Sequence, residues 1–97
     1  MKILTSDEFW DYVKRYIPAN TFFLYINNKY SIYDPHYSIY RFDGKHFCVV
    51  FGTDLKYKAK IQLDLMGFKI FHKFIIRQND SHDMKVAYEV FQLTTEE

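Results

Sequence analysis

The chain has 97 residues, of which 48% are hydrophobic and 21% aromatic, and its 13 basic and 12 acidic side chains nearly cancel. This length holds one hydrophobic core, and the apolar content is too high for a disordered segment, so we expect a single domain over residues 1–97. A formal net charge of +1 excludes binding to DNA or to an anionic membrane through overall charge alone.

The sequence also predicts where the protein is found. Cys48 is the single cysteine, so no disulfide can form within the chain. Residues 1–10 lack the basic and apolar segments of a secretory signal, and no apolar run approaches the roughly 20 residues that cross a bilayer. We therefore expect a cytoplasmic protein that has no membrane partner.

The first predicted element is a helix over residues 6–16. Thr5 and Glu8 have the spacing of a capping box, and Leu4 and Phe9 have that of a hydrophobic staple. The predicted apolar face consists of Phe9, Val13, Tyr16 and Ile17, with Tyr12 at its edge and Trp10 off it. The acidic residues Asp7, Glu8 and Asp11 favour the helix dipole, which indicates a structural role.

A β meander is predicted over residues 21–93, followed by a frayed tail over residues 94–97. Residues 22–26 form a continuous apolar run, typical of a strand covered on both faces. A turn after it returns the chain as a strand over residues 30–33.

The next hairpin pairs residues 37–42 with residues 46–51 around Asp43 and Gly44, a strong turn signal. If these two residues form the whole turn, three pairs lie opposite one another: Tyr40 with Phe47, Ile39 with Cys48, and Tyr37 with Val50. Both faces of this hairpin carry apolar side chains.

Residues 55–65 alternate between apolar and polar side chains, which predicts a half-buried strand. Lys56, Lys58 and Lys60 would then form a basic stripe along its exposed face. Residues 68–77 fit either a strand or a helix, and we favour the strand; a last strand is expected around residues 84–90.

Catalytic and metal-binding patterns are weak. The four histidines, His36, His46, His72 and His82, do not show zinc-site spacing with Cys48, and we expect no metal and no cofactor. A nucleophile pair of His46 and Cys48 is an alternative, but a small core cysteine beside an exposed histidine is the favoured interpretation. Asp80, His82 and Asp83 are interpreted in the same way as a solvated turn.

The predicted fold class is α+β, with one N-terminal helix packed on a mostly antiparallel, strongly curled sheet of five to seven strands. One helix cannot cover the apolar residues on both faces of such a sheet. A closed or curled sheet, a homodimer or a partner protein would cover the rest. Interfaces favour tyrosine, so the candidate interaction surface includes Tyr30, Tyr33, Tyr37 and Tyr40 besides the lysines.

These patterns lead to three functional hypotheses. The first is a non-enzymatic domain that binds a host protein or protein complex. Phe, Tyr, Ile, Asn and Lys are frequent and Gly and Pro are scarce, a composition that AT-rich genes encode and that is common in phages. We therefore expect a phage- or mobile-element-encoded inhibitor of a host nuclease or defence complex. Its role would be comparable to that of an anti-CRISPR protein, and it would act in the host cytoplasm. The second is a nucleic-acid-binding sheet that uses the lysine stripe and nearby tyrosines. The third is a small histidine-dependent enzyme.

Overall fold

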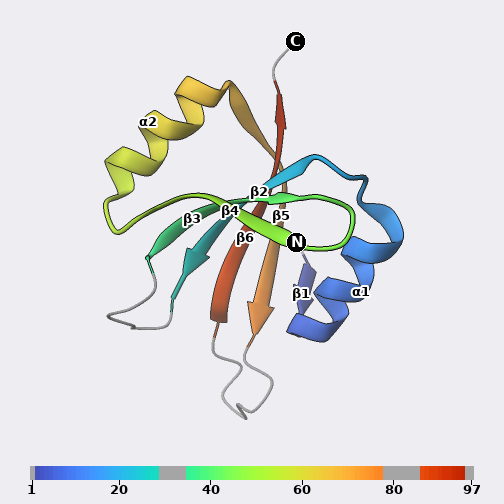
Figure 1. Cartoon of the computed structure of the whole chain (residues 1–97). Helices are drawn as coiled ribbons and strands as arrows, with labels where there is room; N and C mark the ends of the chain where they lie inside the picture. Colours follow the sequence, from blue (N-terminus) through green and yellow to red (C-terminus); the bar gives the residue numbers. More distant parts are fainter. Residues whose placement is uncertain (1, 29–34, 78–85, 96–97) are drawn as a thin grey trace.

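The computed structural model describes residues 2–28, 35–77 and 86–95 (Figure 1). Its elements in chain order are β1 (Lys2–Leu4), α1 (Ser6–Tyr16), β2 (Thr21–Asn27), β3 (Tyr37–Phe42), β4 (Phe47–Thr53), α2 (Lys56–Met66), β5 (Phe68–Arg77) and β6 (Val86–Thr95). The α+β prediction is confirmed, but the prediction of a single helix is wrong, since the structure describes two. The predicted strand over residues 30–33 lies outside the described residues.

The strands form one six-stranded sheet in the order β1-β5-β6-β2-β3-β4. Strand β1 pairs with β5 in parallel, and the other neighbours are antiparallel. The sheet is therefore mostly antiparallel, as expected, and it stays open, so the closed alternative is wrong. The meander holds only for β2, β3 and β4, because β6 inserts between β5 and β2.

The two helices cover opposite faces of the sheet (Figure 1). Successive residues of β2 show the division, because Phe23 packs with α1 and Leu24 belongs to the cluster that packs with α2. This alternation confirms that β2 is covered on both faces. The α1-side cluster contains Phe9, Val13, Phe23, Phe42, Phe74, Ile76 and Val90. The α2-side cluster contains Leu24, Ile39 and Leu93, with Leu63 and Met66 of α2 packed against it.

Helix α1 has the predicted bounds. The Glu8 amide donates to Thr5 Oγ1 over 3.2 Å, and the Thr5 amide donates to Glu8 Oε1 over 3.0 Å, which completes the capping box. Phe9 and Val13 are buried against the sheet as expected. Tyr16, in contrast, is 68% exposed in the last turn of α1, where its ring lies beside that of Tyr12 with centroids 5.2 Å apart.

Helix α2 replaces the strand that was predicted over residues 55–65. Ala59, Leu63 and Met66 follow at intervals of four and three residues, so they fall on one side of a helix and turn toward the sheet. Gly67 ends the helix in the left-handed conformation with φ 73°, which a residue without a Cβ adopts at little cost. The helix contacts β3, β4 and β5.

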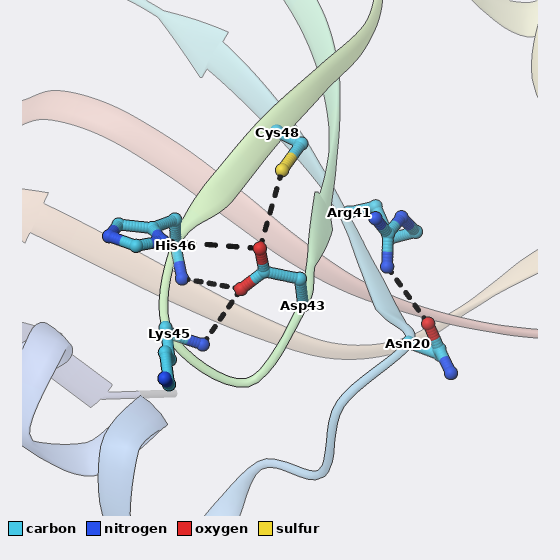
Figure 2. Close-up of polar contacts among 6 residues, drawn as sticks. All are labelled: Asn20, Arg41, Asp43, Lys45, His46 and Cys48. Carbon is cyan, nitrogen blue, oxygen red and sulfur yellow. Dashed lines mark hydrogen bonds and ion pairs between the residues drawn. The ribbon is translucent and has the colours of Figure 1, made fainter.

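The β3–β4 hairpin forms with a different register from the predicted one. Phe42 lies opposite Phe47, and Arg41 lies opposite Cys48, so residues 43–46 form a four-residue loop. The Asp43 carboxylate accepts amide protons from Lys45 over 2.8 Å and from His46 over 2.7 Å, which fixes the longer turn (Figure 2). Each predicted pair is therefore displaced by two residues or more.

Three strands of the described sheet contain an extra residue, and in β6 it is Ala87, between the positions that pair with Ile76 and Arg77 of β5. In β4, Val49 lies opposite Tyr40 and Phe51 opposite Ile39, which leaves Val50 without a partner in the ladder. Phe71 is the corresponding residue of β5, between the positions that pair with Leu93 and Gln92 of β6. Each of these β-bulges shifts the alternation of its strand by one residue.

The end of the chain also differs in part from the prediction. The strand over residues 68–77 is confirmed as β5. Thr94 and Thr95 pair with Lys69 and Phe68, so they belong to β6 and not to a frayed tail. Within the described residues, no helix has the length and apolar character that spanning a bilayer requires.

Candidate functional site

Exposed apolar side chains concentrate on β4, α2 and the connection between them. Ten large hydrophobic residues of the described part are exposed, and six of them lie within residues 49–65. The six are Val49, Val50, Leu55, Tyr57, Ile61 and Leu65. Isolated surface hydrophobics are ordinary, but a group confined to one segment indicates an interaction site.

Helix α2 contributes a continuous stripe to this group. Tyr57, Ile61 and Leu65 are 59%, 52% and 77% exposed and follow one another at intervals of four residues. At about 100° per residue they lie on the side of the helix opposite Ala59, which is 3% exposed. We call Tyr57, Ile61 and Leu65 the outer stripe. The helix therefore has two apolar faces, and only one of them contacts the sheet.

The three lysines of the predicted basic stripe lie on α2, so the prediction that they line one face of a strand is wrong. Lys58 borders the outer stripe on one side, three residues before Ile61, and Lys60 borders it on the other side, three residues after Tyr57. Lys56 lies one turn from Lys60. All three are exposed, and none forms an ion pair with a described acidic residue.

The N-terminus of α2 adds to this positive charge. Leu55 is the N-cap residue and provides no side-chain hydrogen bond, and the first turn contains no acidic residue. Lys56 and Lys58 instead lie in that turn, where the helix dipole is already positive. Asp54 directly precedes Leu55 and accepts the His36 amide over 3.0 Å, so one carboxylate offsets part of this charge. The three lysines still leave this end of the outer stripe basic.

The predicted tyrosines do not join the lysines. Tyr40 packs in the α1-side cluster, with ring centroids 5.0 Å from Tyr25 and 6.2 Å from Phe47, so it lies on the face of the sheet away from α2. Tyr37 contacts the ring of His36 at 4.5 Å. Tyr30 and Tyr33 lie outside the described residues. A combined surface of the lysines with Tyr40 is thus not formed.

A small polar cavity lies beside Tyr40. Its volume is about 130 Å³, and it is lined by Tyr25, Asn27, Pro35, Ser38, Tyr40 and Tyr88. Desolvation by burial raises the pKa of Tyr25 well above its usual value, and the neighbouring Tyr40 and Tyr88 act in the same direction. Tyr25 therefore stays neutral and serves the packing of the sheet.

His46 and Cys48 meet at Asp43 and not at each other (Figure 2). Cys48 Sγ lies 3.8 Å from Asp43 Oδ2, and His46 Nδ1 lies 4.0 Å from the same oxygen. The carboxylate also accepts the two loop amides, and the hydrogen bonds from His46 and then Lys45 hold the pKa of Asp43 below its usual value. Asp43 thus stabilises a turn. Cys48 is half-buried, so the expectation of a core cysteine is wrong.

Metal-binding side chains do not gather in the part of the chain that the structure describes. No three His, Cys, Asp or Glu side chains among residues 2–28, 35–77 and 86–95 are placed to hold a metal ion. His72 packs its ring 5.4 Å from that of Phe74. The predicted turn with Asp80, His82 and Asp83 lies outside the described residues.

A groove of about 300 Å³ crosses the start of β2 and the ends of β5 and β6. The rings of Phe22 and Phe68, with centroids 4.8 Å apart, form part of its wall. Its full lining is Pro18, Asn20, Thr21, Phe22, Phe68, Phe71, Gln92, Leu93, Thr94 and Thr95. Because none of these side chains titrates near neutral pH, the groove offers no general acid or base.

Comparison with known proteins gives no relative: no protein-family model, curated protein or solved structure matches the chain.

Proposed function

We propose that the protein is a non-enzymatic protein-binding domain and that the outer stripe of α2 is its contact surface. The observation that carries this proposal is the exposure of Tyr57, Ile61 and Leu65 on the side of α2 opposite the sheet. Burial of apolar surface is the main favourable term in protein association, and a row of large apolar side chains supplies it. Tyr57 adds a residue type that is frequent among binding hot spots.

The other two hypotheses have less support in the described residues. An enzyme would need an acid, a base or a nucleophile beside a cavity, and neither the 300 Å³ groove nor the Asp43 turn provides one that is free to react. A second hollow of about 290 Å³ on α1 is lined by acidic residues, but Glu8 is held in the capping box and Asp11 pairs with Lys14.

A nucleic-acid site would combine lysines with several stacking aromatics. The outer stripe has one ring, Tyr57, beside Lys58 and Lys60, and its other two members are aliphatic. Tyr40 lies on the other face of the sheet.

The finer proposal concerns the target. A small domain without catalytic groups can act by occupying a surface of a larger assembly, so an inhibitor of a host nuclease or defence complex is one form of the proposed function. The same experiment addresses it, because such a target would be identified among the captured proteins.

The test is affinity capture of proteins from a cell lysate. The wild-type protein, Ile61→Ser and Ile3→Ser each serve as bait, with and without nuclease treatment. Ile3 is the matched control, since it is 53% exposed on β1 against 52% for Ile61 on α2. We expect discrete proteins that survive nuclease, that are retained by Ile3→Ser and that are lost with Ile61→Ser. Capture that vanishes with nuclease, or that does not change with Ile61→Ser, would contradict the proposal.

A further inference from the structure

We infer that the segment that occupies the outer stripe of α2 is an acidic amphipathic helix of a partner protein. This inference rests on the proposed function, and it adds the secondary structure and the charge of the partner. Three observations carry it: the direction of the stripe, the charges along its borders, and the net charge of α2 itself.

The direction of the outer stripe fits another helix. Tyr57, Ile61 and Leu65 form a ridge of residues four apart, which extends about 12 Å along the helix axis at 1.5 Å per residue. Such ridges pack into the grooves between the corresponding ridges of a second helix. An extended peptide gains most of its affinity from main-chain hydrogen bonds to a sheet edge, and a helix surface offers none of these.

The charges on its borders fit acidic groups. Lys58 and Lys60 lie on the two sides of the stripe, Lys56 extends the basic region to the first turn, and none of them is paired with a described acidic residue. Asp64, four residues after Lys60, lies on the same side as Lys60 near the C-terminal end of the stripe, so the basic border is confined to the N-terminal part. The helix dipole and the missing side-chain cap make the same end positive. Glutamates that flank the apolar face of a partner helix would meet these lysines at the rim of the contact, where opposite charges raise the association rate and select the partner.

A second copy of the chain does not fit this surface. The helix has three lysines and one aspartate, Asp64, so its charge is +3 − 1 = +2. Packing two outer stripes together would bring two such positive surfaces into contact, and like charges across an interface disfavour association. The charge of α2 therefore favours a different, negatively charged protein.

The experiment measures binding of four labelled probes by fluorescence anisotropy. The first is a synthetic helix with a leucine stripe bordered by glutamates, and the second is its twin with lysine for each glutamate. The third is an acidic peptide of the first one's composition with its leucines rearranged so that no stripe forms, and the fourth is a single-stranded oligodeoxynucleotide. Each is titrated with the wild type, Ile61→Ser, Leu65→Ser, Ile3→Ser and the triple variant Lys56→Gln, Lys58→Gln, Lys60→Gln.

We expect the first peptide to bind at least about tenfold more tightly than the second and third, because only it matches both the stripe and the charges. Ile61→Ser and Leu65→Ser should each weaken it by about tenfold, and Ile3→Ser should not. The triple lysine variant should bind it more weakly and with a flatter dependence on salt. Circular dichroism melting of each variant verifies folding, and Leu65→Ser replaces Ile61→Ser if the latter is unfolded.

Each of the following results would overturn the inference. Equal affinity for the acidic peptide and its basic twin would remove the charge argument, and tighter binding of the oligodeoxynucleotide would assign the lysines to phosphates. Self-association that is lost with Ile61→Ser would assign the stripe to a second copy. If no peptide binds while cellular capture still depends on Ile61, the helix inference fails and the proposed function stands. If neither peptide binding nor cellular capture depends on Ile61, both the helix inference and the proposed function fail.

Discussion

Phe47 and Phe51 lie four residues apart on β4 but pack on opposite faces of the sheet, Phe47 in the α1-side cluster and Phe51 in the α2-side cluster. In a regular strand, residues four apart share a face. Val50 is the extra residue between them, and its insertion moves every later side chain of β4 to the other face. One bulge thus allows a single strand to supply a phenylalanine to each core cluster.

Deletion of Val50 should therefore be tolerated. Removing it makes β4 regular while Phe47 and Phe51 keep their faces, and Val50 itself is 41% exposed. We expect a folded protein that loses less than about 2 kcal/mol of unfolding free energy, measured by chemical denaturation. Deletion of Arg41 from the regular strand β3 is the control, because it moves Ile39 to the other face and should abolish cooperative unfolding. Equal effects of both deletions would contradict the account.

Tyr25 should make the protein sensitive to alkali. Burial raises its pKa, so above about pH 10, where tyrosines of the unfolded chain ionise, the unfolded state gains a charge that folded Tyr25 resists. The contribution of Tyr25 to the free energy of unfolding is thus fully present below that pH and falls as the pH rises above it. Tyr25→Phe should reduce this loss, measured by chemical denaturation at about pH 9 and about pH 11. Tyr16→Phe, at an exposed position, should leave the alkaline loss of stability as it is in the wild type. If Tyr25→Phe also lost as much stability as the wild type, the prediction would be refuted.

Asp43 should make the stability of the protein depend on pH at the acidic end of the pH range. The amides of His46 and Lys45 hold the pKa of its carboxyl below the usual value, so its contribution is present above about pH 4 and is lost as the pH falls through the lowered pKa. We expect the melting temperature of Asp43→Ala to vary less than that of the wild type between about pH 5 and about pH 2. Lys45→Ala keeps both amide donors and should behave as the wild type. If the melting temperature of Asp43→Ala fell with decreasing pH as much as that of the wild type, this role of Asp43 would be contradicted.

Gly52 is required by the close approach of Pro35. A Cβ at position 52 would lie 2.9 Å from Pro35 Cγ, which is closer than van der Waals contact, and 3.4 Å from Pro35 Cβ. Gly52→Ala should cost about 1–3 kcal/mol through this overpacking. In a Pro35→Ala background the same substitution should cost clearly less, which a double-mutant cycle by urea denaturation measures. An equal cost in both backgrounds would show that the proline ring is not the cause.

Strand β4 should set the tendency of the protein to self-associate. It is the last strand at one edge of the described sheet, its seven residues contain neither a charge nor a proline, and Val49 is 69% exposed. Val49→Lys should lower the concentration-dependent increase in mass seen by sedimentation equilibrium and leave the melting temperature nearly unchanged. Ile3→Lys on β1, the other edge, is the control. A homodimer through β4 is ruled out if both variants behave alike.

The local signals in the sequence were sufficient for α1 and for most strands. The capping box of Thr5 and Glu8 fixes the start of α1, and its buried positions Phe9 and Val13 repeat with helical spacing. The hairpin of β3 and β4 was also predictable, but its register was not. That register depends on the Asp43 side chain, which accepts two amides and extends the turn to four residues.

Helix α2 was predicted as a strand because its outer stripe supplies apolar residues where a helix that only packs on a core has polar ones. Tyr57, Ile61 and Leu65 alternate along the sequence with Ala59 and Leu63, and the five residues together imitate an alternation of period two. The spacing of Ala59, Leu63 and Met66, followed by Gly67, was the signal for a helix. The feature that misled the secondary-structure prediction is therefore the proposed binding surface. The parallel pairing of β1 with β5 joins segments too distant in the chain for any local pattern.

The central position of β6 has a consequence for how the protein is made. Of the six strands β6 is synthesised last, yet it lies between β5 and β2 and joins the pair β1 and β5 to the three-stranded unit β2, β3 and β4. Until β6 leaves the ribosome, these two parts have no shared hydrogen bonds through which to assemble. Both clusters also lack a member until then, since Val90 and Leu93 belong to β6. Completion of the sheet thus waits for the synthesis of β6, and a polypeptide interrupted before residue 86 would expose both halves of the core.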